Sequence, residues 1–172
     1  MKFSLRSALA PLHIWTVVIS VVLDQFSKWA VIQWIPLGTH IPLMPSLNLA
    51  HIKNRGAAFG MFHDMPNLFR AGFFGLVTIG CFYLLIYWLG TIPKQDRWQR
   101  FSLSLILGGA IGNVIDRVLF GHVTDFVDFY IGEWHFATFN IADSAITIGV
   151  TLMFISMIPW PIKLFKFRTK AK

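Results

Sequence analysis

Residues 101–120 read FSLSLILGGAIGNVIDRVLF, and this stretch decides the fold class. Its apolar run is about 20 residues long, which is the length that an α-helix needs to cross a bilayer. Three glycines within it allow another helix to approach closely. Asn113, Asp116 and Arg117 share one helical face near its end. Because ionisable side chains are costly in lipid, the stretch indicates a transmembrane helix whose polar end serves either as scaffold or as a functional site.

Three other stretches have comparable length and apolar character, namely residues 12–34, 68–89 and 141–160. The whole chain is 55% hydrophobic and only 13% charged, whereas soluble domains are about 45–50% apolar and about 25% charged. The sequence therefore predicts an α-helical polytopic membrane protein with four transmembrane helices. It contains no internal repeat, and we expect residues 1–172 to form a single domain.

The basic side chains cluster at the ends of these stretches, which predicts their orientation. Ten of the fifteen lysines and arginines fall into three groups: Lys2 and Arg6; Lys94, Arg97 and Arg100; Lys163, Lys166, Arg168, Lys170 and Lys172. By the positive-inside rule, both termini and residues 90–100 lie in the cytoplasm. Residues 35–67 and 121–140 then lie outside. Nucleic-acid binding would need one basic surface, so this placement argues against it.

The first apolar stretch follows two basic residues, as the core of a secretory signal peptide does. It is too long for that role, however, and it ends without a small-residue cleavage site. We interpret it as a retained span. The outer segment that follows, residues 35–67, is rich in proline and glycine between short apolar patches. This composition favours short strands and turns, so we expect a small strand-rich cap at the outer membrane surface.

With this topology, the polar residues of the spans gather at the outer face. Asp24 and Lys28 lie in the outer half of the first span, four residues apart, where an ion pair is plausible. Asn140 and Asp143 lie at the outer start of the last span, and Asp125 lies in the loop before it. Taken singly, each group has a structural interpretation, such as a helix cap for Asn140. Two acids on either side of one cleft favour a functional site.

A pair of neighbouring carboxylates can share one proton because two adjacent charges are costly. The ionised member then deprotonates a water and the protonated member polarises an amide, as in aspartic proteases. Zinc-protease and serine-hydrolase motifs are absent from the sequence. A metal between His122 or His135 and Asp125 or Asp128 is the weaker interpretation. We therefore expect no metal and no cofactor.

Five blocks of sequence, in order, carry a family resemblance. They are Asp24-Gln25-Phe26-Ser27-Lys28, Asn54-Arg55-Gly56-Ala57-Ala58-Phe59, the run from Gly108 to Arg117, Gly121-His122-Val123-Thr124-Asp125-Phe126, and Phe139-Asn140-Ile141-Ala142-Asp143-Ser144. Together they closely resemble bacterial lipoprotein signal peptidase (signal peptidase II), an intramembrane aspartic peptidase. The resemblance covers nearly the whole chain.

The resemblance implies which residues act. Asp125 and Asp143 match the catalytic dyad of the family, and Asp128 is a minor alternative because Val127-Asp128-Phe129 partly echoes Val123-Thr124-Asp125-Phe126. The residues expected to shape the pocket are Asn54, Gly56, Asn113, Arg117, Asn140 and Ala142, with Asp24, Lys28 and Asp116 in support. The first outer segment is expected to form a strand-rich cradle beside the substrate.

The resemblance also implies the substrate and the place of action. The substrate would be a prolipoprotein, cut just before a diacylglyceryl-modified cysteine, and globomycin-type inhibitors would bind. The protein would lie in the bacterial inner membrane, in contact with lipid, with its active site toward the periplasm. Two other readings stay open at this point. One is a small proton- or ion-coupled transporter, and the other is a non-catalytic assembly subunit.

Overall fold

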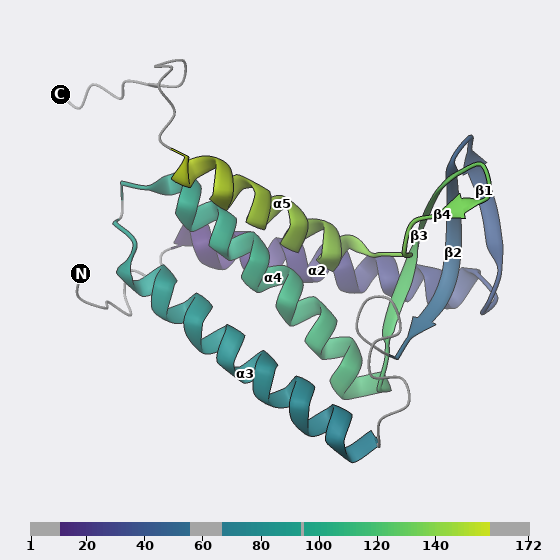
Figure 1. The fold of residues 1–172 in the computed structure, drawn as a ribbon, viewed down its shortest axis with the longest axis horizontal. Coiled ribbons are helices and arrows are strands. Elements are labelled where there is room, and N and C mark those ends of the chain that lie inside the picture. Colours follow the sequence, from purple (N-terminus) through teal and green to yellow (C-terminus); the bar gives the residue numbers. More distant parts are fainter. Residues whose placement is uncertain (1–10, 56–66, 94, 159–172) are drawn as a thin grey trace.

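The computed structural model describes residues 11–55, 67–93 and 95–158. Four helices occur in this part of the chain: α2 (Pro11–Trp34), α3 (Asn67–Thr91), α4 (Arg97–Phe120) and α5 (Ile141–Met157). A small antiparallel sheet comprises β1 (His40–Met44), β2 (Leu47–Asn54), β3 (Val123–Ile131) and β4 (Trp134–His135), in that order. The sheet lies at one end of the helices, beside the end of α2 and the start of α5 (Figure 1).

Between His13 and Lys28, helix α2 buries a row of polar side chains and exposes many of its apolar ones. Those buried at a spacing of three or four residues are His13, Thr16, Ser20, Asp24 and Lys28. The exposed side chains include Trp15, Ile19, Val22, Leu23 and Phe26. This is the reverse of a helix on the surface of a soluble protein, and it is what lipid as the surrounding solvent requires. Among the described residues, two helices are long and apolar enough to cross a membrane, His13–Trp34 and Arg97–Phe120. Gly75–Thr91 and Ile141–Met157 are apolar but shorter.

Helix α4 packs against α2, α3 and α5, and its glycines make the close contacts possible. A Cβ atom on Gly109 would overlap the backbone oxygen of Ala142 in α5. One on Gly112 would overlap the carboxylate of Asp24 in α2. Small residues therefore let three helices meet at the polar end of α4, as the sequence predicts.

The described helices follow the predicted stretches within about two residues, except at the start of α4. Helix α4 begins at Arg97 rather than residue 101, because the side chain of Asp96 caps it by accepting a hydrogen bond from the amide of Gln99 at 3.1 Å. The predicted end of the last span, residues 159 and 160, lies outside the described residues.

The segment predicted as a loop between the last two spans forms strands β3 and β4. Strand β3 pairs with β2 from the first outer segment, so that Asp125 lies opposite Ile52 and Asp128 opposite Asn48. Both carboxylates are buried rather than solvated, each with 1% of its surface exposed. The reason is tertiary: β3 is covered by the ends of α2 and α4 and by β2.

Replacing Gly112 with alanine is expected to destabilise the fold, because the new methyl group overlaps the Asp24 carboxylate. Overpacking of this kind costs about 1–3 kcal/mol. The measurement is the thermal midpoint of unfolding in detergent. Gly80→Ala in α3 is the matched control, since its Cβ meets nothing within 4 Å. An unchanged midpoint for Gly112→Ala would contradict the close approach of α2 and α4.

Candidate active site

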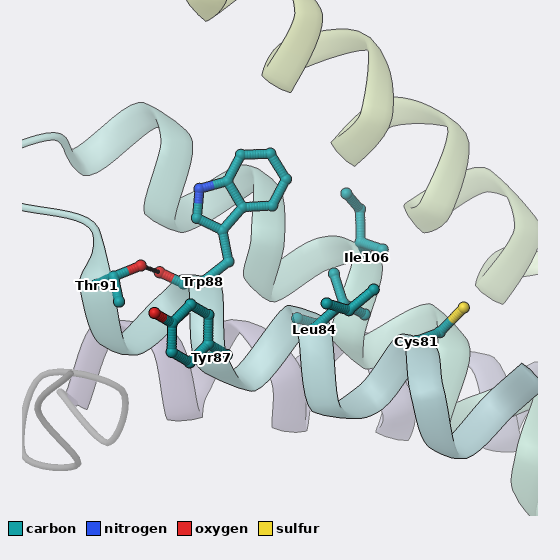
Figure 2. A pocket seen from close by; sticks show the side chains of 7 residues that line it. Cys81, Leu84, Tyr87, Trp88, Thr91 and Ile106 are labelled. Atoms are coloured by element: carbon teal, nitrogen blue, oxygen red, sulfur yellow. Dashed lines mark hydrogen bonds between the residues drawn. The ribbon is translucent and has the colours of Figure 1, made fainter. Parts of the chain in front are cut away.

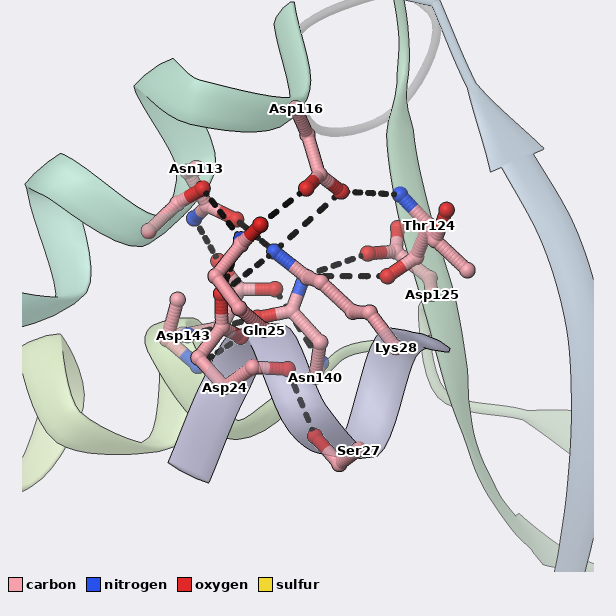
Figure 3. A network of polar contacts seen from close by, with 12 residues as sticks. Asp24, Gln25, Ser27, Lys28, Asn113, Asp116, Thr124, Asp125, Asn140 and Asp143 are labelled. Atoms are coloured by element: carbon pink, nitrogen blue, oxygen red, sulfur yellow. Dashed lines mark hydrogen bonds and ion pairs between the residues drawn. The ribbon is translucent and has the colours of Figure 1, made fainter. Parts of the chain in front are cut away.

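Lys28 is a buried cation that joins two helices. Its Nζ lies 2.8 Å from Oδ2 of Asp24 and 3.3 Å from Oδ2 of Asp116, and it donates to Oδ1 of Asn113 at 3.1 Å (Figure 3). Only 2% of the Lys28 side chain is exposed. The predicted ion pair between Asp24 and Lys28 is confirmed. Removing one partner of such a buried pair costs about 3–5 kcal/mol, since a charge is left without compensation.

The two carboxylates that hold Lys28 also bind backbone amides of other elements. Oδ1 of Asp24 accepts from the amide of Ala142, at the start of α5, at 2.9 Å. Oδ2 of Asp116 accepts from the amide of Thr124, in β3, at 2.9 Å. These two amides belong to the residues that immediately precede Asp143 and Asp125. The charged cluster therefore positions both predicted dyad members through their neighbours in the chain.

Gln25 completes this cluster and was not among the predicted site residues. Its Nε2 lies within hydrogen-bond distance of Oδ2 of Asp24, Oδ1 of Asp116 and the backbone oxygen of Gly112, at 3.0 to 3.1 Å. Its position beside Asp24 in the first sequence block was the available signal. The contacts themselves depend on how closely α2 approaches α4.

Asn140 contacts both members of the predicted dyad. Its Nδ2 donates to Oδ1 of Asp125 at 2.7 Å, and its Oδ1 accepts from the amide of Asp143 at 3.0 Å. Its own amide donates to Oδ2 of Asp143 at 3.3 Å, so the two residues form a capping box at the start of α5. The N-cap interpretation of Asn140 is confirmed, and the same side chain also connects the two acids.

Asp125 is held in β3 by two amide side chains. Besides the bond from Asn140, its Oδ2 accepts from Nδ2 of Asn54 in β2 at 3.0 Å. Burial raises the pKa of Asp125 to about 6, and the nearby charge of Asp143 adds to this. The hydrogen bonds from Asn54 and Asn140 and the charge of Lys28 lower the same pKa, without outweighing burial.

Asp143 lies at the start of α5, partly accessible. Its Oδ1 accepts from Nδ2 of Asn113 at 2.8 Å. Asn113 in turn accepts from both Lys28 and Asn140 through its Oδ1. The structure thus brings most of the predicted site residues into one network: Asp24, Lys28, Asn54, Asn113, Asp116, Asp125, Asn140, Ala142 and Asp143.

Among the described residues, two predicted ones, Arg117 and Asp128, stand apart from this network. Arg117 is exposed, and its Nη1 donates to the backbone oxygen of Asn113 in its own helix at 3.4 Å. Gly56 lies outside the described residues. Asp128 binds Asn48, His40 and His135, so the structure engages it elsewhere in the sheet rather than at Asn140. Within the described ranges, no three or more His, Cys, Asp or Glu side chains are arranged to hold a metal ion.

A cavity of about 560 Å³ lies away from these carboxylates, between α3 and α4 (Figure 2). Its lining is almost wholly apolar: Cys81, Leu84, Leu85, Tyr87, Trp88, Thr91 and Ile106. No carboxylate or histidine is among these lining residues. The polar network at the other end of α4 is therefore the candidate site for chemistry, and Cys81 lines an apolar surface.

Comparisons with known proteins find relatives that share the name lipoprotein signal peptidase. The family model for signal peptidase (SPase) II matches residues 16–159. The chain is 43% identical over 142 residues to the lipoprotein signal peptidase of Hydrogenovibrio crunogenus, covering 83% of this chain and 82% of that one. It is 41% identical over 148 residues to the lipoprotein signal peptidase of Coxiella burnetii, covering 86% and 90%.

A solved structure shares the fold. It is that of a bacterial membrane enzyme obtained by the in meso method at 1.9 Å resolution, with a TM-score of 0.77 and 34% sequence identity. The alignment covers 88% of this chain and 95% of that one. The described fold, the length of the family match and the identity to its members all agree, and the chain belongs to the signal peptidase II family of membrane peptidases.

Proposed function

We propose that this chain is an aspartic endopeptidase that removes the signal peptide from prolipoproteins, cutting before the diacylglyceryl-modified cysteine, with Asp125 and Asp143 as its catalytic dyad. The observation that carries the proposal is Asn140, whose side chain donates to the carboxylate of Asp125 and accepts from the backbone amide of Asp143 at the sheet end of the helices. The family is named for the activity. No comparison supports the transporter interpretation, since the relatives found are named as peptidases.

The proposed mechanism assigns different protonation states to the two acids. Asp125 is buried, it accepts hydrogen bonds from the amide side chains of Asn54 and Asn140, and its raised pKa of about 6 leaves it protonated to higher pH than an ordinary aspartate. Asp143 lies at the N-terminus of α5, where helix amides stabilise a negative charge, and it accepts from Asn113. A dyad of this kind needs one acid and one base, and we assign the acid to Asp125 and the base to Asp143.

In the first step, Asp143 takes a proton from a water while the water oxygen bonds to the carbonyl carbon of the scissile amide. Asp125 gives its proton to the carbonyl oxygen, so a neutral gem-diol forms. In the second step, Asp143 passes its proton to the amide nitrogen and the C–N bond breaks. Asp125 recovers a proton from the diol as the carboxylic acid product forms. Protons and electrons balance without a metal or cofactor.

The arrangement in the membrane belongs to the proposal. All four helices span the bacterial inner membrane as one domain over residues 1–172, with both termini cytoplasmic and the sheet end toward the periplasm. The lipid-facing apolar side of α2 supports this, as do the basic groups near the opposite end of the helices. The signal peptide approaches from lipid, and Gly56, Arg117 and Ala142 complete the pocket. Globomycin-type inhibitors are expected to compete with it.

Asp125→Asn and Asp143→Asn are each expected to lower the turnover of a lipidated prolipoprotein by at least about 10²–10⁴-fold. General acid–base catalysis contributes about this much, and an amide can replace neither proton carrier. Cleavage in detergent is the measurement, with Glu133→Gln, an exposed acid in the turn after β3, as the matched control. Near-normal cleavage by both dyad variants would falsify the proposal. Globomycin should block cleavage by the unaltered protein.

The pH dependence of kcat/KM is expected to show an alkaline limb that begins near pH 6. The protonated form of Asp125 is required and is lost as the pH rises through its raised pKa of about 6. Because kcat/KM reports groups of the free enzyme, the limb should be visible with substrate well below saturation. A flat profile from acid to mildly alkaline pH would contradict the assignment of Asp125 as the acid.

A further inference from the structure

A second buried carboxylate lies in the sheet, and the proposed mechanism does not use it. Asp128 of β3 binds one side chain from each of the other three strands. Asn48 of β2 donates to its Oδ2 at 2.8 Å, Nδ1 of His40 of β1 lies 3.0 Å from the same oxygen, and Nδ1 of His135 of β4 lies 2.7 Å from Oδ1. Since an ionised carboxylate only accepts, both histidines carry their proton on Nδ1.

The surroundings of Asp128 keep it ionised although it is buried. Burial acts to raise its pKa, but the hydrogen bonds from Asn48, His135 and His40 outweigh burial and hold the pKa below its ordinary value. Hydrogen bonds to a charged carboxylate are about twice as strong as those between neutral groups. Asp128 therefore links the strands through strong hydrogen bonds.

Strands β2 and β3 are paired through an irregularity between two site-bearing positions. Leu49 lies opposite Val127 and Ile52 lies opposite Asp125. Three steps along β2 thus match two steps along β3, so β2 carries one extra residue. The bond from Asn48 to Asp128 lies on one side of this bulge, and the bond from Asn54 to Asp125 lies on the other.

A bulge is where a strand pair can change register, and a one-residue shift moves every side chain to the other face. Asn54 would then no longer point at Asp125. A strong side-chain bond beside the bulge prevents this shift, because it fixes which β2 residue lies opposite Asp128. The two histidines fix the flanking strands but do not set the β2–β3 register.

We propose that Asp128 is a positioning residue, which with Asn48 locks the register of β2 on β3 and so holds the Asn54 amide against the catalytic Asp125. This inference rests on the proposed function of Asp125. Its measurable consequence follows from the hydrogen bond of Asn54, which lowers the pKa of Asp125. When the hydrogen bond between Asn48 and Asp128 is lost, Asp125 should stay protonated to higher pH.

The other charged and polar groups around Asp125 stay in place in this experiment. They are Asp143 of α5, Lys28 of α2, Asn140 at the cap of α5, and Asp116 of α4, which binds the neighbouring amide of Thr124. Neither His40 nor His135 is among the groups that act on Asp125. A shift of the limb therefore reports the Asn54 contact.

The test compares pH profiles of kcat/KM for prolipoprotein cleavage. Asn48→Ala and Asn54→Ala should each move the alkaline limb to higher pH, by about half a unit to one unit. The double variant should move it no further than Asn54→Ala alone, because the lock acts through Asn54. His135→Ala, which breaks the link to β4 but leaves the Asn48 bond, is the matched control and should leave the limb unmoved. Asp128→Asn should behave as Asn48→Ala does.

Two results would overturn the inference: an unmoved limb in Asn48→Ala, or equal shifts in Asn48→Ala and His135→Ala, which would indicate general loosening of the sheet. If Asp128→Asn fails to fold, the Asn48 and Asn54 variants still decide the question. Failure of the proposed function is separable, because the unaltered protein would then not cleave the substrate, or the dyad variants would.

Discussion

Lys28 is a single buried cation between two carboxylates, and the rest of the site depends on it. Asp24 binds Lys28 through Oδ2 and accepts from a backbone amide through Oδ1, whereas Oδ2 of Asp116 contacts both Lys28 and a backbone amide. Those amides belong to Ala142 and Thr124. In a low-dielectric interior these bonds are strong and cannot be exchanged for water. One ion pair network thus fixes two helices, the start of α5 and the start of β3.

This arrangement explains how acids from distant parts of the chain come together. Asp125 and Asp143 follow Thr124 and Ala142 directly, so anchoring the two amides sets the path of each acid. Asn140 then spans the remaining gap by contacting both. The glycines of α4 are the packing counterpart, since a side chain at Gly112 would occupy the volume of the Asp24 carboxylate. The close approach of the helices and the ion pairs between them therefore depend on each other.

Much of this could be predicted from the sequence, because helix length, charge position and short motifs are local signals. The predicted stretch 12–34 and helix α2 (Pro11–Trp34) differ by one residue. Strand β3 could not be predicted, since its pattern, VTDFVDFYI, has acids where alternation would place apolar residues, and its pairing with β2 is a long-range contact. The contacts of Gln25 and Asp128 were missed for the same reason, because most of their partners come from other elements.

The charge balance of the network also explains why Lys28 does not bring the pKa of Asp125 below its ordinary value. Lys28 lowers the pKa of Asp125, yet burial prevails and the pKa rises to about 6. The positive charge of Lys28 is already matched by Asp24 and Asp116, one cation against two carboxylates. The groups that bind Asp125 directly are amides, which orient it without supplying a full charge. In this site the cation serves the architecture, and under the proposed mechanism Asp125 serves as the proton donor.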